Sequence, residues 1–267
     1  MLTNITIGQY YPSQSVVHSL DPRLKLVSAL IYIIVLFFIQ NFWGFLFTLA
    51  CLFTIIKISR VPPLFLLRGL RGIIFILLFT AGSSIFFTAG DTELFKIFVF
   101  RVTLEGLILA GEMAFRLCLL IVGSSLLTLT TSPIELTDAI EYLMKPLKRL
   151  GVPAHEIAMM MTISLRFIPT LMEEMEKIMK AQSARGADFD TGGIIKRARS
   201  LIPLLAPLFI SSFRRADELA MAMEARCYRG GINRTRMKVM KLTRRDYAAV
   251  PLLLIYAAGI FVLNLTA

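Results

Sequence analysis

Two arginines near the ends of long amphipathic segments have the clearest capacity to bind a partner. Each follows an alanine and precedes a small residue, in the motifs Ala184-Arg185-Gly186 and Ala225-Arg226-Cys227. An arginine guanidinium is a planar fork that binds a carboxylate through two parallel hydrogen bonds, which lysine cannot do. The helix dipole also favours any single arginine at a helix C-terminus, but the matched pair argues for more than that local effect. The motifs therefore predict binding to an acidic partner rather than catalysis.

Both motifs lie in a charged segment of 115 residues, 132–246, for which the sequence predicts three amphipathic helices. Ser132-Pro133 followed by Glu135 is typical of a capping box, so the first helix begins there and runs to about Leu150. Gly151-Val152-Pro153 then breaks the helix.

The second and third helices carry the two motifs at their ends. The second runs from about Ala154 to Arg185, because its apolar residues recur at spacings of three and four. The third begins after Ser200, with prolines close to its start, where they are tolerated best, and continues to about Tyr228. Breaker sequences bound these helices: Gly186 caps the second, a polar turn at 188–193 separates the two, and Gly230-Gly231 closes the third.

The second helix is rich in methionine, at Met159, Met160, Met161, Met172 and Met175. Methionine is unbranched and polarizable, so it suits a surface that must adapt to a partner. It also fills the cores of helical proteins, and both interpretations stay open from the sequence.

The chain as a whole has the composition of a membrane protein. Hydrophobic residues make up 56% of it and its mean hydropathy is +0.71, above the usual range of a soluble domain. A helix needs about 20 mostly apolar residues to cross a bilayer. Runs near that length cover residues 24–39, 42–56, 73–89, 104–131 and 247–265. We therefore expect an all-α integral membrane protein with about five transmembrane helices and a cytoplasmic domain of three amphipathic helices.

Basic residues set the expected orientation. Residues 132–246 carry 20 Lys and Arg against 13 Asp and Glu, and the link between the second and third apolar runs is also basic. The positive-inside rule then places the N-terminus and this segment in the cytoplasm. The chain divides into a membrane domain of about four spans (1–131), a cytoplasmic domain (132–246) and a C-terminal transmembrane helix (247–267). Asp21-Pro22 is expected to cap and start the first span.

Several classes of function find no support in the sequence. The phosphate loop of an ATPase, Gly-x-x-x-x-Gly-Lys-Ser/Thr, is absent. His155 follows Pro153 and is expected to be a solvated residue at a helix start. Three cysteines without paired spacing indicate neither a disulfide framework nor a metal site. The net charge of +11 accompanies no nucleic-acid-binding motif, so we predict no catalytic residue, no cofactor and no nucleic-acid partner.

Glu112 and Arg116 are charged residues inside the fourth apolar run, where charge is costly. Their spacing of four residues allows them to pair on one face of a helix. A proton relay would need further ionisable residues in the other runs, so we favour a structural ion pair.

The chain resembles the transmembrane T component of energy-coupling factor (ECF) transporters over nearly its full length. The resemblance rests on Leu20-Asp21-Pro22-Arg23, on Ser164-Leu165-Arg166-Phe167-Ile168-Pro169 and on both Ala-Arg motifs. In that family the paired motifs end two coupling helices that dock into a pair of ABC-type ATPases. The resemblance implies that Ala184, Arg185 and Gly186 form the first coupling motif and that Ala225, Arg226 and Cys227 form the second. Cys227 replaces the usual glycine but is still small, so docking should survive, although we expect the two helix ends not to be equivalent.

The resemblance also implies a location and a mechanism. The chain would lie in a bacterial or archaeal cytoplasmic membrane as a non-catalytic subunit. ATP-driven motion would pass through its helices to a membrane-embedded, substrate-binding S component that releases a vitamin or a metal ion inside the cell. The S component, rather than this chain, would choose the substrate. The alternative from another class is a self-contained channel or secondary carrier, with 132–246 as its regulatory domain.

Overall fold

The computed structural model describes residues 10–88, 93–97, 100–187, 189, 193–230 and 240–265. The chain divides into two compact units, one formed by residues 1–139 with 238–267 and the other by residues 140–237. The boundary between them lies inside helix α6 (Pro133–Met144). The first unit holds the long apolar helices, and the second holds both Ala-Arg motifs.

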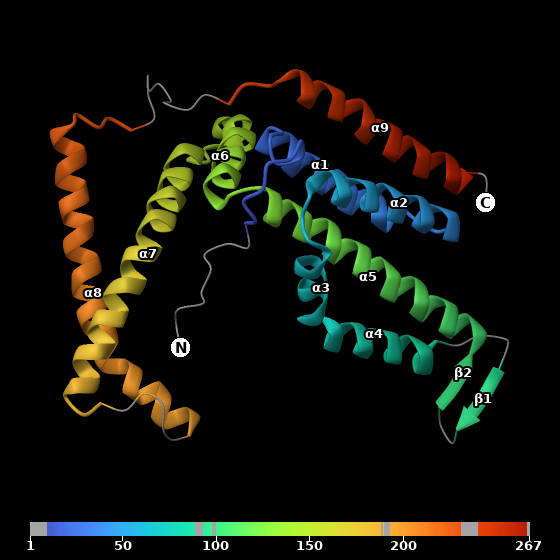
Figure 1. The fold of residues 1–267 in the computed structure, drawn as a ribbon, viewed down its shortest axis with the longest axis horizontal. Coiled ribbons are helices and arrows are strands. Elements are labelled where there is room, and N and C mark those ends of the chain that lie inside the picture. Colours follow the sequence, from blue (N-terminus) through green and yellow to red (C-terminus); the bar gives the residue numbers. More distant parts are fainter. Residues whose placement is uncertain are drawn as a thin grey trace. The chain divides into compact units, whose positions relative to one another are not determined.

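The first unit is built from apolar helices and one short hairpin. In chain order its elements are α1 (Pro22–Phe37), α2 (Phe42–Ser59), α3 (Pro63–Arg71), α4 (Ile74–Phe87), β1 (Glu93–Ile97), β2 (Phe100–Thr103), α5 (Leu104–Thr130) and α9 (Arg244–Leu265). Helices α1, α2, α5 and α9 lie side by side, and α4 lies along α5 (Figure 1). The prediction of an all-α membrane protein is confirmed for the body of the chain, and the antiparallel β1–β2 hairpin is a small unpredicted addition.

The apolar helices follow the predicted runs, although they differ in how far they could reach across a bilayer. Helices α2, α5 and α9 each have the length and composition of a span. Helices α3 and α4 meet at a bend of 60° and would together make a fourth. Helix α1 has 16 residues, about 24 Å of helix, against a hydrocarbon core of about 30 Å. The number of five spans therefore stays a prediction.

Helix α1 begins as the Asp21-Pro22 pattern predicts. The Asp21 carboxylate accepts a hydrogen bond from the Arg23 amide at 2.9 Å, and Pro22 occupies the first turn. The same carboxylate receives the Arg23 Nε at 3.0 Å and Nη2 at 2.9 Å. Arg23 Nη2 also donates to the Met240 carbonyl at 2.9 Å, so the cap of α1 contacts the segment that leads to α9.

A buried carboxylate completes this link between the two ends of the first unit. Asp246, in the first turn of α9, is 2% exposed and accepts a hydrogen bond from the Asp21 amide at 2.8 Å. It also accepts the Thr243 amide and the Thr243 hydroxyl, each at 2.7 Å. The Asp246 carboxylate therefore caps the Thr243 amide at the start of α9, as the acidic residue of a capping box does. This cap was not predicted, although Thr-x-x-Asp before an apolar run is the pattern that indicates one.

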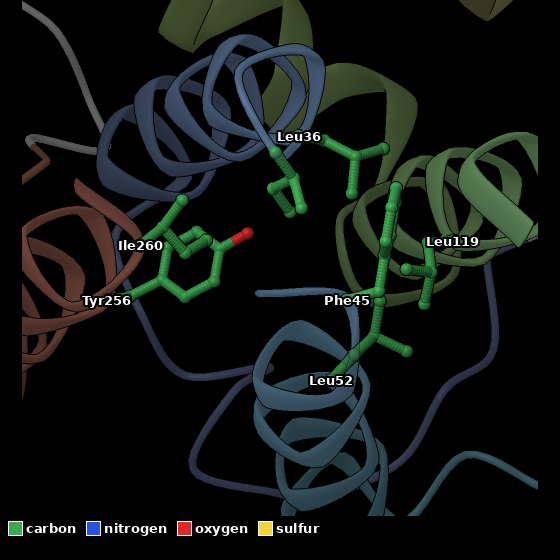
Figure 2. Close-up of a cluster of buried hydrophobic side chains, with 7 residues drawn as sticks. Leu36, Phe45, Leu52, Leu119, Tyr256 and Ile260 are labelled. Carbon is green, nitrogen blue, oxygen red and sulfur yellow. The ribbon is translucent and has the colours of Figure 1, made fainter. Parts of the chain in front are cut away.

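The core of the first unit is a cluster contributed by four helices. The side chains that point toward one another are Leu36 of α1, Phe45 and Leu52 of α2, Leu119 of α5, and Tyr256 and Ile260 of α9 (Figure 2). Each is 9% exposed or less. The outer faces are apolar as well, with Phe42 73% exposed and Phe75 78% exposed. A large apolar outer surface of this kind suits contact with lipid.

The second unit begins within α6 and continues into a short 3-10 helix. Helix α6 starts as predicted, because the Ser132 hydroxyl accepts the Glu135 amide at 3.3 Å. The prediction that this helix runs on to Leu150 is wrong, since α6 ends at Met144 and the 3-10 helix η1 (Lys145–Leu150) follows. Pro146 accounts for the change, because a proline disfavours α-helical backbone at the residue before it.

The two long helices of the second unit are α7 (Ala154–Ala184) and α8 (Ile194–Ala225). The second predicted helix is confirmed, whereas a start of the third after Ser200 is wrong, because α8 begins seven residues before Leu201. Pro203 and Pro207 lie inside α8, since a helix of 32 residues keeps enough bonds to continue past each missing amide hydrogen. Figure 1 shows α8 changing direction in its first half. The predicted turn at 188–193 falls mostly outside the described residues.

Candidate functional site

The first Ala-Arg motif closes α7 with a Schellman cap. Arg185 is the cap residue, and Gly186 adopts the left-handed backbone with φ of 89°. The Gly186 amide donates to the Ser183 carbonyl and the Ala187 amide donates to the Gln182 carbonyl, both at 3.0 Å. This pair of hydrogen bonds defines the Schellman cap and satisfies two carbonyls that the helix leaves unpaired. The prediction that Gly186 caps the helix is confirmed.

The second motif closes α8 in the same way, with cysteine in place of glycine. The Cys227 amide donates to the Glu224 carbonyl at 2.8 Å, and the Tyr228 amide donates to the Met223 carbonyl at 3.0 Å. Cys227 has φ of 56°, inside the left-handed region. A residue with a Cβ is strained there by about 1–2 kcal/mol. The cap is therefore complete, but it holds an unfavourable backbone conformation at its third residue.

The two arginines occupy equivalent backbone positions. Arg185 has φ of −88° and ψ of 8°, and Arg226 has φ of −93° and ψ of 14°. The backbone is therefore the same at the two arginines, but the ends are not equivalent at the third motif residue, where Cys227 carries a strain that Gly186 does not. The predicted closure of the third helix by Gly230-Gly231 is wrong, because α8 ends at Ala225.

Both arginines are available to an external partner. All residues of the two motifs are exposed to solvent. Within the described part of the chain, the side chains of Arg185 and Arg226 make no hydrogen bond or ion pair. Each lies at the electronegative end of a helix, which favours a cation by about 0.3–1 kcal/mol. Two such free guanidiniums can each take a carboxylate from another protein.

Glu174 links α7 to the middle of α8. Its carboxylate accepts the Ser211 hydroxyl at 2.5 Å and Arg215 Nη2 at 3.0 Å. The hydrogen bond from Ser211, together with the charge of Arg215, lowers the pKa of Glu174 below its ordinary value. Closer to the start of α7, the Tyr228 hydroxyl contacts the Met159 sulfur at 3.0 Å. These contacts show that α7 and α8 run in opposite directions where they cross (Figure 1).

The antiparallel arrangement places the two motifs toward opposite ends of the helix pair. Tyr228, next to the second motif, contacts Met159, whereas Arg185 lies 26 residues further along α7. At 1.5 Å per residue this separates the two motifs by about 39 Å along α7. Glu174 lies between them, so the two helices are fastened between their motif-bearing ends.

An apolar surface accompanies the pair. A groove of about 240 Å³ lies between α7 and α8, with Phe167, Leu171 and Leu219 among its walls. Helix α8 also exposes a row of large apolar side chains: Leu201, Ile202, Leu205, Phe209, Ile210 and Phe213. Exposed apolar area on this scale marks a surface for a membrane or for another protein.

The methionines of α7 add to the apolar surface of the helix pair. Met160 and Met161 are 56% and 39% exposed, which favours the binding-surface interpretation for these two. Met159, Met172 and Met175 are half-buried, and Met159 contacts Tyr228 of the segment after α8, so they also take part in packing.

His155 differs from its prediction as a solvated residue. Its Nδ1 lies 3.1 Å from a Glu141 carboxylate oxygen, and the two side chains are 28% and 12% exposed. Its Nε2 is buried without a hydrogen-bond partner in the described residues. The pair joins α6 to the start of α7, a contact across two helices that spacing along the chain does not reveal. No group of three or more metal-ligating side chains occurs in the described part of the chain.

The predicted ion pair between Glu112 and Arg116 is also wrong. Arg116 Nη2 donates to the Ile39 carbonyl at 2.7 Å, and its guanidinium lies 5.5 Å from the centre of the Phe45 ring. No ion pair joins it to Glu112 among the residues that are described. Arg116 therefore holds the end of α1 against α5, because the carbonyl after α1 and the ring of α2 take its guanidinium in place of the half-buried Glu112 carboxylate one turn away.

The chain matches known proteins over nearly its whole length. The CbiQ family, described as a cobalt transport protein, matches residues 13–239. The energy-coupling factor transporter transmembrane protein EcfT of Clostridium kluyveri is 58% identical over 250 residues, which is 93% of each chain. The EcfT protein of Bacillus subtilis is 46% identical over 266 residues, which is 99% of this chain and 100% of its own. The chain therefore belongs to the EcfT family of energy-coupling factor transporter transmembrane proteins.

Proposed function

We propose that this chain is the coupling subunit of an ECF-type ABC importer. It binds two ABC-type ATPase subunits through Ala184, Arg185 and Gly186 at one end and Ala225, Arg226 and Cys227 at the other. The observation that carries the proposal is the pair of helix ends with the same cap and an exposed arginine at the same backbone position. Two equivalent ends fit two similar partners. The attraction of an arginine to the dipole of its own helix acts at each end separately, so it would not require the two ends to match.

The arginines give each end its affinity. A guanidinium that enters an acidic groove forms two parallel bonds with a carboxylate and loses little conformational freedom in doing so. The small residues on either side, such as Gly186, allow the partner backbone to approach closely. An arginine in this position behaves as a binding hot spot, whose removal costs about 2 kcal/mol or more.

The helix pair converts motion of the two ATPases into motion at the membrane. Because Glu174 fastens α7 to α8 between the motifs, a change in the distance between the motif ends turns one helix about the other at this contact. Long helices transmit such displacement because their interiors are hydrogen-bonded throughout.

The apolar row of α8 and the methionines of α7 receive the S component. A membrane-embedded partner presents an apolar surface, and a flexible methionine surface adapts to more than one such partner. Substrate choice, whether a vitamin or a metal ion, then belongs to the S component. The ATP is hydrolysed in the partner subunits, and this chain is non-catalytic.

The proposed orientation follows from charge. The segment 132–246 is basic, so it lies in the cytoplasm together with the N-terminus, in a multi-pass protein of a bacterial or archaeal cell membrane. The proposed division of the chain remains 1–131, 132–246 and 247–267. Both motif ends then face the compartment that supplies ATP.

Co-purification with the ATPase subunits tests the motifs. We expect the double variant Arg185→Ala/Arg226→Ala to lose about 2 kcal/mol of binding free energy per end, roughly 30-fold each, and to lose ATP-driven uptake in proteoliposomes. The matched control is Lys180→Ala/Arg229→Ala, which removes two exposed cations close to the same helix ends. The control should retain both binding and uptake.

Two results would overturn the proposal. Equal ATPase binding by the double variant and its control would show that the motifs do not dock. Uptake by this chain alone in proteoliposomes, without ATPase subunits or a second membrane protein, would instead establish a self-contained channel or secondary carrier.

A further inference from the structure

A cavity of about 740 Å³ opens on the first unit, which carries neither of the two motifs. Its walls come from the segment before α1, from the end of α2 and from the start of α9. Three cationic residues line it: Lys57 and Arg60 from the end of α2, and Arg245 from the first turn of α9. No aspartate or glutamate is among its lining residues.

Contacts with the other described residues do not neutralise the charges of these three cations. Arg245 Nη1 donates to the Ser19 hydroxyl at 3.1 Å, a neutral acceptor that leaves its charge uncompensated. Lys57 and Arg60 make no ion pair with any described residue. Three uncompensated positive charges around one cavity repel one another and attract an anion.

Helix dipoles do not explain the three charges together. The negative end of α2 favours Lys57 and Arg60, but Arg245 lies at the positive end of α9, where a cation is unfavourable. An anion in the cavity would turn this unfavourable position into a favourable one.

The backbone conformation of Arg60 is also energetically unfavourable, which indicates a function for its side chain. Arg60 has φ of 55°, in the left-handed region at the end of α2. Glycine or asparagine would hold that conformation with less strain, and an arginine there is unfavourable by its backbone alone. Strained residues of this kind persist where a functional group must be held in place.

The part of the lining that comes from the segment before α1 is held by hydrogen bonds. The Ser15 hydroxyl lies 2.7 Å from His18 Nδ1, and the Tyr11 carbonyl lies 3.0 Å from His18 Nε2. Because a carbonyl only accepts, Nε2 carries the proton and Nδ1 accepts from Ser15. Burial lowers the pKa of His18 below its ordinary value, which favours the neutral form of the ring. The positive charge of the cavity therefore comes from its lysine and its two arginines.

Two apolar side chains also line the cavity. Val16 and Ile58 line it and are 51% and 47% exposed. Lys57 lies in the last turn of α2 and Arg245 in the first turn of α9, both candidate spans, so the cavity lies at one face of the apolar helices. An anion with an attached apolar tail fits both kinds of wall.

We propose that this cavity binds a phosphate group, supplied by the head group of an acidic phospholipid. Lys57, Arg60 and Arg245 contact the phosphate, Ser19 adds a hydroxyl, and Val16 with Ile58 contacts the glycerol and the first acyl carbons. The lipid holds the start of α9 against the end of α2. This site is independent of the proposed ATPase contacts.

The test uses the full-length chain in phosphatidylcholine nanodiscs that contain spin-labelled phosphatidylglycerol. The measurement is the fraction of label held immobile as its content rises. We expect Lys57→Gln/Arg245→Gln to weaken retention about fivefold per cation, on the order of 30-fold together. The control Lys241→Gln/Arg244→Gln removes the same charge from exposed residues outside the cavity and should have a much smaller effect.

Arg60→Gly separates binding from folding. It relieves the left-handed strain, so thermal unfolding in pure phosphatidylcholine should occur no lower than in the parent, while retention of phosphatidylglycerol falls about fivefold. Equal loss of retention in the cavity variant and in the control would overturn the proposal. Ready displacement of the label by inorganic phosphate would retain the phosphate site but overturn the lipid as its source.

Discussion

Replacing Cys227 with glycine tests whether the two helix ends differ only in backbone strain. Cys227 holds φ at 56° at the end of α8, and its counterpart Gly186 holds φ at 89° at the end of α7. A residue with a Cβ carries about 1–2 kcal/mol of strain in this region, while glycine loses about 0.5–1 kcal/mol more conformational freedom on folding. The difference predicts that Cys227→Gly stabilises the end of α8 by about 0.5–1 kcal/mol.

Side-chain packing does not complicate this estimate. Cys227 is exposed, and a Cβ added at Gly186 would meet none of the described atoms within 4 Å. Cys227→Ala is the matched control, because it removes the thiol but keeps the Cβ, so its helix end should be as strained as the parent's. Gly186→Ala is the reverse change and should destabilise the end of α7 by a similar amount.

Amide hydrogen exchange measures the opening of a helix end directly. The Tyr228 amide closes the cap of α8, and nitrogen-15 labelling of the seven tyrosines reduces the spectrum to a few signals that include it. The predicted stabilisation slows its exchange about two- to fivefold in Cys227→Gly. Equal exchange in Cys227→Gly and the parent, or equal slowing in Cys227→Ala, would refute the strain argument.

Two further substitutions test the contacts inside each unit. Asp246→Ala removes the buried acceptor of the Asp21 and Thr243 amides, so the free energy of unfolding in detergent should fall by about 3 kcal/mol, and a variant as stable as the parent would contradict this. The Ser211 hydrogen bond lowers the pKa of Glu174 in the folded protein. The ionised Glu174 carboxylate therefore stabilises the fold fully above the unfolded-state pKa of about 4.3, and this stabilisation is lost as the pH falls through the lower pKa of the folded state. Exchange protection where α7 meets α8 should decline over that interval, and the same decline in Glu174→Gln would show that another group causes it.

The features predicted correctly are those that local chemistry determines. A helix end needs a residue that satisfies nearby backbone groups, and Asp21, Ser132 and Gly186 each do so within three residues. Apolar runs likewise predict long apolar helices, because the backbone in lipid must satisfy its own hydrogen bonds. These signals need no knowledge of what lies across the fold.

The missed features depend on partners that are distant in sequence or on competing preferences. The Asp21 amide and the Asp246 carboxylate are 225 residues apart, and no spacing rule joins them. Arg116 had a plausible partner one turn away, but the carbonyl of Ile39 takes its Nη2. Prolines suggested a late start for α8, whereas the helix begins at Ile194 and continues through them. The low helix propensity of a single proline is small compared with the combined contribution of the backbone hydrogen bonds in a 32-residue helix.

The cysteine in the second motif shows what determines a helix-end geometry. If the third motif residue alone set the cap, cysteine in place of glycine would have changed the end of α8. Both cap hydrogen bonds nevertheless form, and the contact of Tyr228 with Met159 holds the residue that follows Cys227. The bonds of the cap therefore outweigh a strain of about 1–2 kcal/mol at one residue. A partner's affinity for the helix end is reduced only in proportion to the fraction of molecules in which the cap hydrogen bonds are broken. Because the cap of α8 is formed with cysteine, the proposed ATPase contact at Arg226 needs no glycine.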